Sequence, residues 1–211
     1  MNKIIDDLIE RYPALKECKT QISELAARVI AVYENGGRLF VAGNGGSCAD
    51  ADHIAGELLK SFRLRRHIAE DEREVLVSDF GTDGEKLAAV LEPALPCVAL
   101  HSQIGFVTAF WNDGGADYVY AQQLYAQSRP GDMFIGISTS GNAANIRYAL
   151  MAAKLKMVNT ALLTGDRHGS CEKYAELSVT VPASEPYLVQ EFHLPIYHAV
   201  CLAVEEHFYG E

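Results

Sequence analysis

The sequence lacks the paired cysteines of disulfide scaffolds, zinc sites and redox motifs. Its five cysteines are scattered and include no Cys-x-x-Cys pair: Cys18, Cys48, Cys97, Cys171 and Cys201. An odd number of isolated cysteines is typical of reduced thiols that pack as small hydrophobic side chains. Cys48 is of particular interest, because it follows a glycine-rich turn and a helix N-terminus lowers the pKa of a thiol.

The sequence also lacks long apolar runs and a basic stripe. No apolar run approaches the roughly 18–20 residues that span a bilayer, and residues 1–18 are amphipathic and acidic rather than signal-like. The formal net charge is −10, which argues against a general nucleic-acid surface. We therefore expect a cytoplasmic protein that binds neither membranes nor nucleic acid directly.

The composition that remains is that of a globular chain. Of 211 residues, 49% are hydrophobic and 22% charged, which fits one α/β domain over residues 1–211. Short apolar β-rich runs at 38–43, 96–100, 132–138, 157–165 and 175–181 predict strands. Helical periodicity predicts helices at 2–12, 15–34, 48–62, 102–111, 116–127, 142–155 and 188–208. This alternation predicts a three-layer α/β/α sandwich around a parallel sheet.

Residues 63–91 interrupt the alternation. The segment opens with basic residues, becomes acidic and ends with an apolar periodic stretch. It is long for a connection within a compact domain, so it should carry structure or function. Because charge runs are usually solvated, we expect a helical excursion over the surface, inserted into the domain.

Two strand-to-helix turns predict a phosphate site. Gly43-Asn44-Gly45-Gly46-Ser47 follows the first strand, its glycines allow a close approach of the backbone, and Ser47 can cap the next helix. Ser138-Thr139-Ser140-Gly141-Asn142 follows the third strand and offers three hydroxyls beside helix-start amides. Such turns hold an anion without a basic side chain, whatever the net charge. Both fall at the carboxyl ends of parallel strands, where ligands bind.

Two helical segments carry further polar groups. His53 and Glu57 are spaced i, i+4 and so lie on one face of their helix, as a surface pair or as a base or metal-ligand pair. Gln190 and His198 lie eight residues apart, about 12 Å along a regular helix. They can share one site only if the helix breaks, for which Pro195 is a candidate, or if two subunits contribute. His193 between them is more typical of a core histidine.

Five features therefore occur in order: GNGGS at 43–47, His53 with Glu57, Asn112-Asp113, STSGN at 138–142, and Gln190-Glu191-x-His193-x-x-x-x-His198. Their combination resembles the sugar isomerase (SIS) domain, and within it the phosphoheptose isomerases, over nearly the whole chain. The resemblance implies a flavodoxin-like fold and a homotetramer with active sites between subunits. It implies conversion of sedoheptulose 7-phosphate to glycero-manno-heptose 7-phosphate.

The resemblance also implies residue roles. Proton transfer falls to Glu57 and His198, and one divalent ion, zinc in some members, to His53, Glu57, Gln190 and His198. Substrate contacts are implied at Asn44, Gly45, Gly46, Ser47, Glu57, Asn112, Asp113, Ser138, Thr139, Ser140 and Gln190. Aldose–ketose isomerisation moves a proton between C1 and C2 through an enediol, which suits a carboxylate base, and a metal would polarise the carbonyl.

The chain departs from the phosphoheptose isomerase pattern at four positions. That pattern has a serine, an aspartate and two arginines where this chain has Ala143, Tyr187, Leu188 and Ser61. The length of the sugar is therefore open. A second function also stays open, a non-catalytic SIS module that binds a sugar phosphate and a partner protein, as do members that associate with the bacterial replication initiator. The joint presence of His53, Glu57, Gln190 and His198 favours catalysis.

Overall fold

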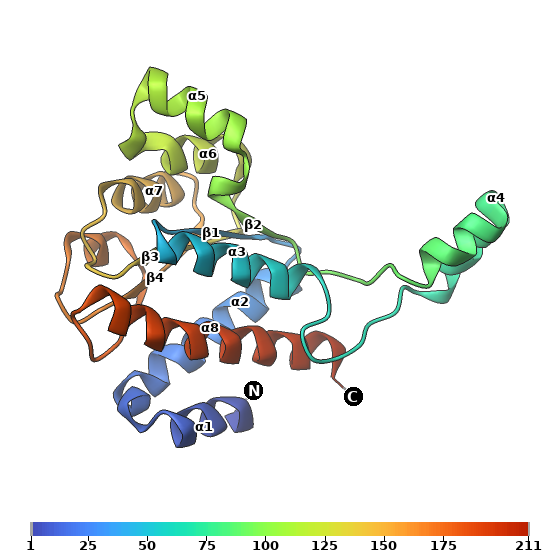
Figure 1. Ribbon diagram of the computed structural model, residues 1–211, viewed down its shortest axis with the longest axis horizontal. Coiled ribbons are helices and arrows are strands. Elements are labelled where there is room, and N and C mark those ends of the chain that lie inside the picture. The colour runs from blue at the N-terminus through green and yellow to red at the C-terminus, as the bar shows by residue number, and fades with distance from the viewer. Residues whose placement is uncertain (1, 211) are drawn as a thin grey trace.

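The computed structural model describes residues 2–210, which form helix layers on both faces of a central sheet (Figure 1). The five strands are all parallel, in the order β2-β1-β3-β4-β5. They are β1 Leu39–Ala42, β2 Cys97–Ala99, β3 Met133–Ser138, β4 Asn159–Thr164 and β5 Leu177–Thr180. The strands and sheet that the sequence predicts are confirmed.

The helices pack on two faces of this sheet, as predicted. One face carries α1 Asn2–Arg11, α2 Lys19–Glu34, α3 Gly46–Leu59 and α8 Pro186–Tyr209. The other carries α5 Ile104–Gly114, α6 Val119–Gln127 and α7 Ala144–Leu155. Short 3-10 turns complete the connections: η1 Pro13–Cys18, η2 Leu100–Ser102, η3 Ala116–Tyr118 and η4 Ser170–Tyr174.

Side chains alternate between the two faces of the sheet along each strand, and this divides the hydrophobic core into two clusters. Val41, Ile135 and Leu163 belong to the cluster under α2, α3 and α8, while their neighbours Phe40 and Phe134 belong to the cluster under α6 and α7. Successive side chains of a strand point to opposite faces, so a strand covered by helices on both sides is apolar throughout. This explains the continuous apolar runs in the sequence.

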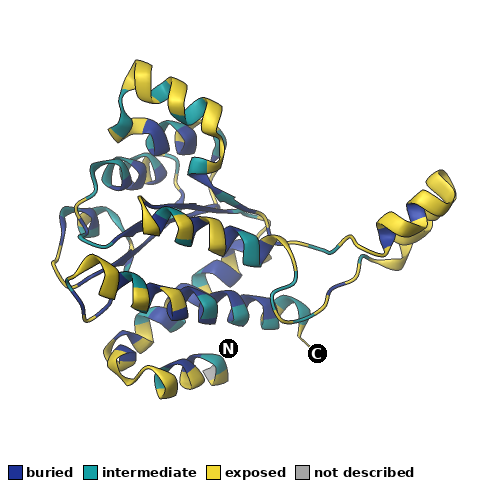
Figure 2. Cartoon of the chain, in the orientation of Figure 1, coloured by how far each residue is buried: buried dark blue, intermediate teal, exposed yellow. Residues whose placement is uncertain are grey.

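Residues 63–91, which we call the arm, contain helix α4 Glu70–Ala88. The predicted helix is confirmed, but the expectation that it lies over the surface is wrong. The arm projects away from the body (Figure 1), and most of its residues are exposed (Figure 2). Two extended connections on either side of α4 carry it outward.

The thiols differ from the expectation at one position. Cys18, Cys97, Cys171 and Cys201 are buried, as expected of packed thiols. Cys48 is half-buried, and its pKa is raised by burial and by the carboxylate of Asp52 one turn further on. The expected lowering of the Cys48 pKa at the helix start is therefore wrong. Within residues 2–210, no helix is long and apolar enough to cross a membrane.

Candidate functional site

The two predicted ligand turns meet at one edge of the sheet. They follow β1 and β3, which are adjacent strands, at the point where the strand order reverses. Asn44 and Asn145 join them, since each side-chain amide donates to the other's carbonyl oxygen at 2.9 and 2.8 Å. Ligands of open α/β sheets bind at this switch point.

The first turn differs from the sequence interpretation at Ser47. Helix α3 begins at Gly46, and its N-cap is Gly45, with φ of 55° and no side-chain cap. Ser47 is buried at 3% exposure and does not cap the helix. Gly46 is instead the residue that faces Gln190: a Cβ at this position would lie 2.6 Å from the Gln190 amide nitrogen. A side chain at position 46 would therefore displace the Gln190 amide from the turn.

The second turn presents hydroxyls to its own backbone. The Ser138 hydroxyl accepts a hydrogen bond from the N–H of Ala143 at 3.4 Å, and that of Ser140 from the N–H of Asn142 at 3.2 Å. Thr139 and Ser140 are half-buried. The turn itself contains no lysine or arginine. Hydroxyls and amides are thus its only donors.

A cavity of about 190 Å³ adjoins the first turn. Its lining includes Asn44, Trp111, Tyr120 and Asn145. Trp111 is 61% exposed and directly precedes Asn112 and Asp113 on α5. Asn112 and Asp113 are exposed, and the Asn112 amide donates to the Asp113 carboxylate at 2.9 Å. The predicted sugar contacts on α5 therefore follow a side chain that lines this cavity.

The second cluster of predicted residues lies between α3 and α8. Nε2 of His53 is 3.1 Å from Oε1 of Glu57. The ring centroids of His53 and His198 are 4.9 Å apart, and the ring of Phe62 packs on His198 at 5.5 Å. The structure thus brings together His53, Glu57 and His198, as the resemblance implies.

Polar neighbours hold the His53 ring with Nε2 toward Glu57. Nδ1 of His53 lies 3.0 Å from the Tyr197 hydroxyl, which donates to the Asp50 carboxylate at 3.3 Å. Burial raises the pKa of Asp50, while the bond from Tyr197 and the charge of His53 oppose the rise. Burial and the neighbouring His53 lower the pKa of His198, which favours the neutral imidazole near pH 7.

Gln190 does not join this cluster within one chain. Helix α8 runs uninterrupted from Pro186 to Tyr209, so of the two alternatives left open by the sequence, the break at Pro195 does not occur. Gln190 packs against Gly46, about 12 Å along the helix axis from His198. The Gln190 amide faces the first turn, whereas His198 packs against His53 and Phe62, so the two side chains are not directed at one point within a chain.

The implied metal set therefore does not fit a single chain. Among residues 2–210, no three histidine, cysteine or carboxylate side chains are placed to hold a metal ion. Both ring nitrogens of His53 already face protein groups, Tyr197 and Glu57.

Sequence reasoning missed four residues of these two clusters. Asp50 and Tyr197 neighbour the predicted residues, and the i, i+3 spacing of Asp50 and His53 is the signal that could have identified Asp50. Asn145 pairs with Asn44, and Trp111 lines the cavity, only because the fold brings α5, α7 and the first turn together. No local pattern marks either of them.

Similar proteins decide the family. The chain is 37% identical over 197 residues to the phosphoheptose isomerase of Aneurinibacillus thermoaerophilus, covering 93% of this chain and 86% of that protein. It is 35% identical over 208 residues to phosphoheptose isomerase 2 of Campylobacter jejuni, covering 98% and 90%. The chain belongs to the phosphoheptose isomerase family. It is therefore a phosphosugar isomerase, the first of the two functions that the sequence left open.

Solved structures of phosphoheptose isomerases share the fold. The structure from Francisella tularensis has a TM-score of 0.76 at 24% identity and covers 97% of this chain and 96% of its own. That from Neisseria gonorrhoeae has a TM-score of 0.72 at 27% identity, with 97% and 98% covered. The SIS fold predicted from the sequence is confirmed. No protein-family model matches the chain.

Proposed function

We propose that this phosphoheptose isomerase family member interconverts sedoheptulose 7-phosphate and glycero-manno-heptose 7-phosphate. The observation that carries the proposal is the contact of Glu57 with His53, beside His198, on the helix that opens at the first ligand turn. A carboxylate held by an imidazole, with a second imidazole close by, suits proton transfer between neighbouring carbons. The names of the relatives support the heptose substrate.

In this mechanism the Glu57 carboxylate removes the proton from C1 of the ketose, and the resulting enediol is reprotonated by Glu57 at C2. His198, whose lowered pKa keeps it neutral near pH 7, moves the proton between the two oxygens. The net reaction relocates hydrogens and needs no oxidant or reductant. His53 orients Glu57 through the 3.1 Å contact.

Substrate binding falls to the sheet edge. The phosphate is held by Ser138, Thr139, Ser140 and the amides of the second turn, because oriented N–H and O–H donors suit an anion. The sugar is contacted from the first turn by Asn44, Gly45, Gly46 and Ser47. Asn112, Asp113 and Gln190 contribute further sugar contacts.

The proposal includes active sites completed between subunits of a homotetramer. Within one chain, Gly46 and Glu57 are eleven residues apart on α3, about 16 Å along its axis. The ligand turns and the proton-transfer pair of one chain therefore lie near opposite ends of α3. A second chain that supplies one of the two parts would bring them together, and Gln190 of that chain would complete the set predicted for zinc.

The substrate test is isomerisation in deuterated water. The protein is incubated with sedoheptulose 7-phosphate and with ketose and aldose phosphates of five and six carbons, and proton NMR follows product and deuterium at C1 and C2. We expect the heptose pair to react fastest, with deuterium entering through the enediol, and Glu57→Gln to be inactive. Faster turnover of a shorter sugar would replace the heptose assignment, and no exchange with any of them would refute the proposal.

A further inference from the structure

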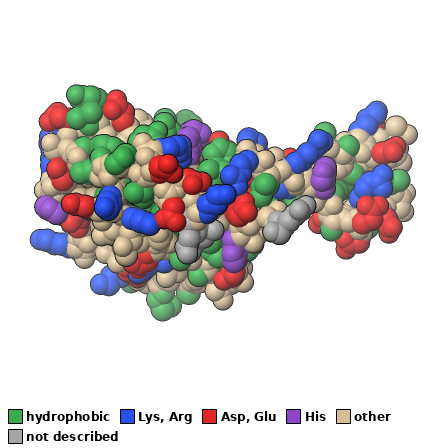
Figure 3. Space-filling model, turned by 90° about the horizontal axis from the view of Figure 1, so that it is seen from below, with side chains coloured by type: hydrophobic (Ala, Val, Ile, Leu, Met, Phe, Trp, Pro, Cys, Tyr) green, Lys and Arg blue, Asp and Glu red, His purple; other side chains and the backbone are tan. Residues whose placement is uncertain are grey.

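The arm exposes apolar side chains that its own chain does not cover. Val75, Phe80 and Val90 are 58%, 63% and 71% exposed. No helix or strand among the described residues packs closely against α4, which stands apart from the body in both views (Figures 1 and 3). An apolar surface of this kind on a soluble protein marks an interaction site.

The arm has an internal structure that shapes this surface. Gly81, with φ of 56°, divides α4 into two helical pieces. The pieces touch at Gly84, where any side chain would collide with the carbonyl of Leu76. An apolar hollow of about 430 Å³ is left open beside them, lined by Ile68, Asp71, Glu72, Val75, Leu76 and Leu91. Helical pieces this short are marginal in water, so their stability requires packing from outside.

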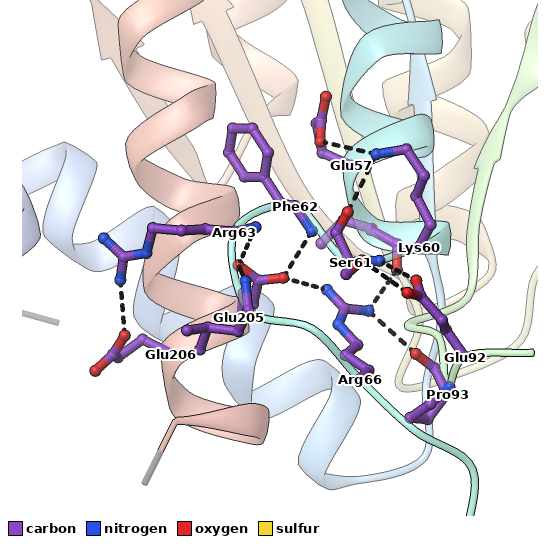
Figure 4. A network of polar contacts seen from close by, with 12 residues as sticks. Glu57, Lys60, Ser61, Phe62, Arg63, Arg66, Glu92, Pro93, Glu205 and Glu206 are labelled. Carbon is purple, nitrogen blue, oxygen red and sulfur yellow. Dashed lines mark hydrogen bonds and ion pairs between the residues drawn. The ribbon is translucent and has the colours of Figure 1, made fainter. Parts of the chain in front are cut away.

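A buried ion pair fixes the base of the arm to the body (Figure 4). Arg66 donates to Glu205 on α8 at 2.9 Å, and the two side chains are 0% and 1% exposed. The same carboxylate accepts the backbone N–H groups of residues 62, 63 and 64 at 2.7, 2.8 and 3.1 Å. The Arg66 guanidinium also stacks over Tyr209 at 4.2 Å. Every oxygen of Glu205 is thus engaged in holding the outgoing connection.

The returning connection is tied to the same point. Glu92 accepts the backbone N–H of Ser61 at 2.6 Å and its hydroxyl at 2.9 Å (Figure 4). Arg66 donates in addition to the carbonyl of Pro93 at 3.2 Å. Both ends of the arm are therefore held at one place. The arm leaves the body in a fixed direction, which suits an occupant with a fixed position relative to this body.

We propose that the arm docks on the body of a second copy of this chain. Its base adjoins the candidate proton-transfer groups, since Phe62 packs on His198 and Nζ of Lys60 lies 3.7 Å from Glu57. If the active site is completed by a second chain, the arm leaves from the surface that this chain must face. In that respect the inference rests on the proposed function.

The size and charge of the arm agree with this occupant. It comprises 29 residues, and a standard interface uses roughly 20–30 residues on each side. Symmetric self-association uses the same contact twice, so two exchanged arms supply a large interface. Helix α4 carries seven acidic and two basic residues, so a contact between two α4 helices would bring like charges together. We therefore assign the docking site to the body of the second copy.

The test measures the molar mass by light scattering and sedimentation over a range of protein concentrations. Val75→Glu combined with Phe80→Glu introduces charge into the docking face. We expect the wild type to be oligomeric and this variant to dissociate at protein concentrations at least tenfold higher than the wild type. Ser78→Glu, at an exposed polar position of the same helix, is the matched control and should keep the wild-type mass. Circular dichroism and the melting temperature of the body verify folding.

A photo-crosslinking residue at position 80 identifies the occupant directly. Covalent dimers of this chain, mapped by mass spectrometry to a body peptide, are expected. A monomeric wild type, an unchanged mass of the double variant, or crosslinks only to another protein would overturn the proposal. An arm-dependent oligomer that isomerises no sugar phosphate would contradict the proposed function alone. An active enzyme whose oligomer tolerates both substitutions would contradict the arm proposal alone.

Discussion

Nε2 of His53 lies 3.1 Å from a carboxylate oxygen of Glu57, one helical turn further along α3. The imidazole is held from its other side by Tyr197, and the ring of His198 lies against it at 4.9 Å. Two helices separated by more than a hundred residues in the sequence thus place a carboxylate and two imidazoles together.

Replacing Glu57 by glutamine should abolish isomerisation and leave the fold intact. An amide cannot accept the substrate proton, and a positioned base contributes about 10²–10⁴-fold in rate. Steady-state kinetics should show the loss in kcat. Glu24→Gln, which removes an exposed carboxylate paired with Arg28, is the control and should keep full activity. Full turnover by Glu57→Gln would refute its assignment as the base.

Mixed oligomers extend this test to the assembly. Because His53, Glu57 and His198 meet within one chain, inactive Glu57→Gln chains mixed with inactive His198→Ala chains should regain no activity in verified hybrids. Partial rescue would instead show that the two groups of a functional site come from different subunits. Pairing Ser138→Ala with Glu57→Gln then asks whether the phosphate turn is the part that a second subunit supplies.

Removing two hydroxyls from the second turn should weaken binding of the sugar phosphate. Ser138→Ala combined with Ser140→Ala should cost ~1–3 kcal/mol, because the turn has no basic residue to compensate. Calorimetry with the inactive Glu57→Gln background measures affinity without turnover. Ser78→Ala on the arm is the control. An unchanged dissociation constant would contradict the phosphate assignment.

A divalent ion, zinc in the first place, is predicted for the assembled site. Imidazole and carboxylate ligands suit zinc, although one chain does not bring Gln190 to them. Elemental analysis of the intact oligomer, purified without chelator, should detect metal above background, and Gln190→Ala should lower the content. Metal-free protein whose turnover is indifferent to chelators would contradict this prediction.

Ligand binding at the sheet edge should change the fluorescence of Trp111. It is the only tryptophan of the chain, and it lines the cavity beside Asn44. Titration of the Glu57→Gln variant with sugar phosphate should therefore shift or quench its emission with the same dissociation constant that calorimetry gives. Inorganic phosphate alone, held at the second turn, should have a smaller effect. Heat of binding without any change in emission would place the sugar away from this cavity.

Buried His193 should make the protein less stable in mild acid. It is 0% exposed, and burial lowers its pKa to about 4. As the pH falls from 7 to 5, His193 binds a proton in the unfolded chain but stays neutral in the native state. The free energy of unfolding therefore falls by about 2 kcal/mol. Urea unfolding of wild type and His193→Asn at both pH values measures this term. Exposed His67→Asn should show the wild-type dependence, and equal slopes for all three would contradict it.

The sequence by itself determined the layers and the sheet, and it indicated the candidate site residues. Apolar runs bounded by turn residues were sufficient for the five strands, because parallel strands covered on both faces must be apolar throughout. The i, i+4 spacing of His53 and Glu57 was sufficient for their contact, because helical geometry is local. The two ligand turns were likewise readable from their position after strands.

Only the tertiary structure decided how these parts relate in space. The direction of the arm depends on Arg66 and Glu205, which are 139 residues apart and pair in the core. The Gln190 amide lies against Gly46, and Ser47 does not cap the helix because α3 begins at Gly46, two residues before the predicted start at residue 48. Periodicity reports which residues share a face of one element. Periodicity does not show which side chain of a distant element packs against that face. Packing and charge burial between elements decide this contact.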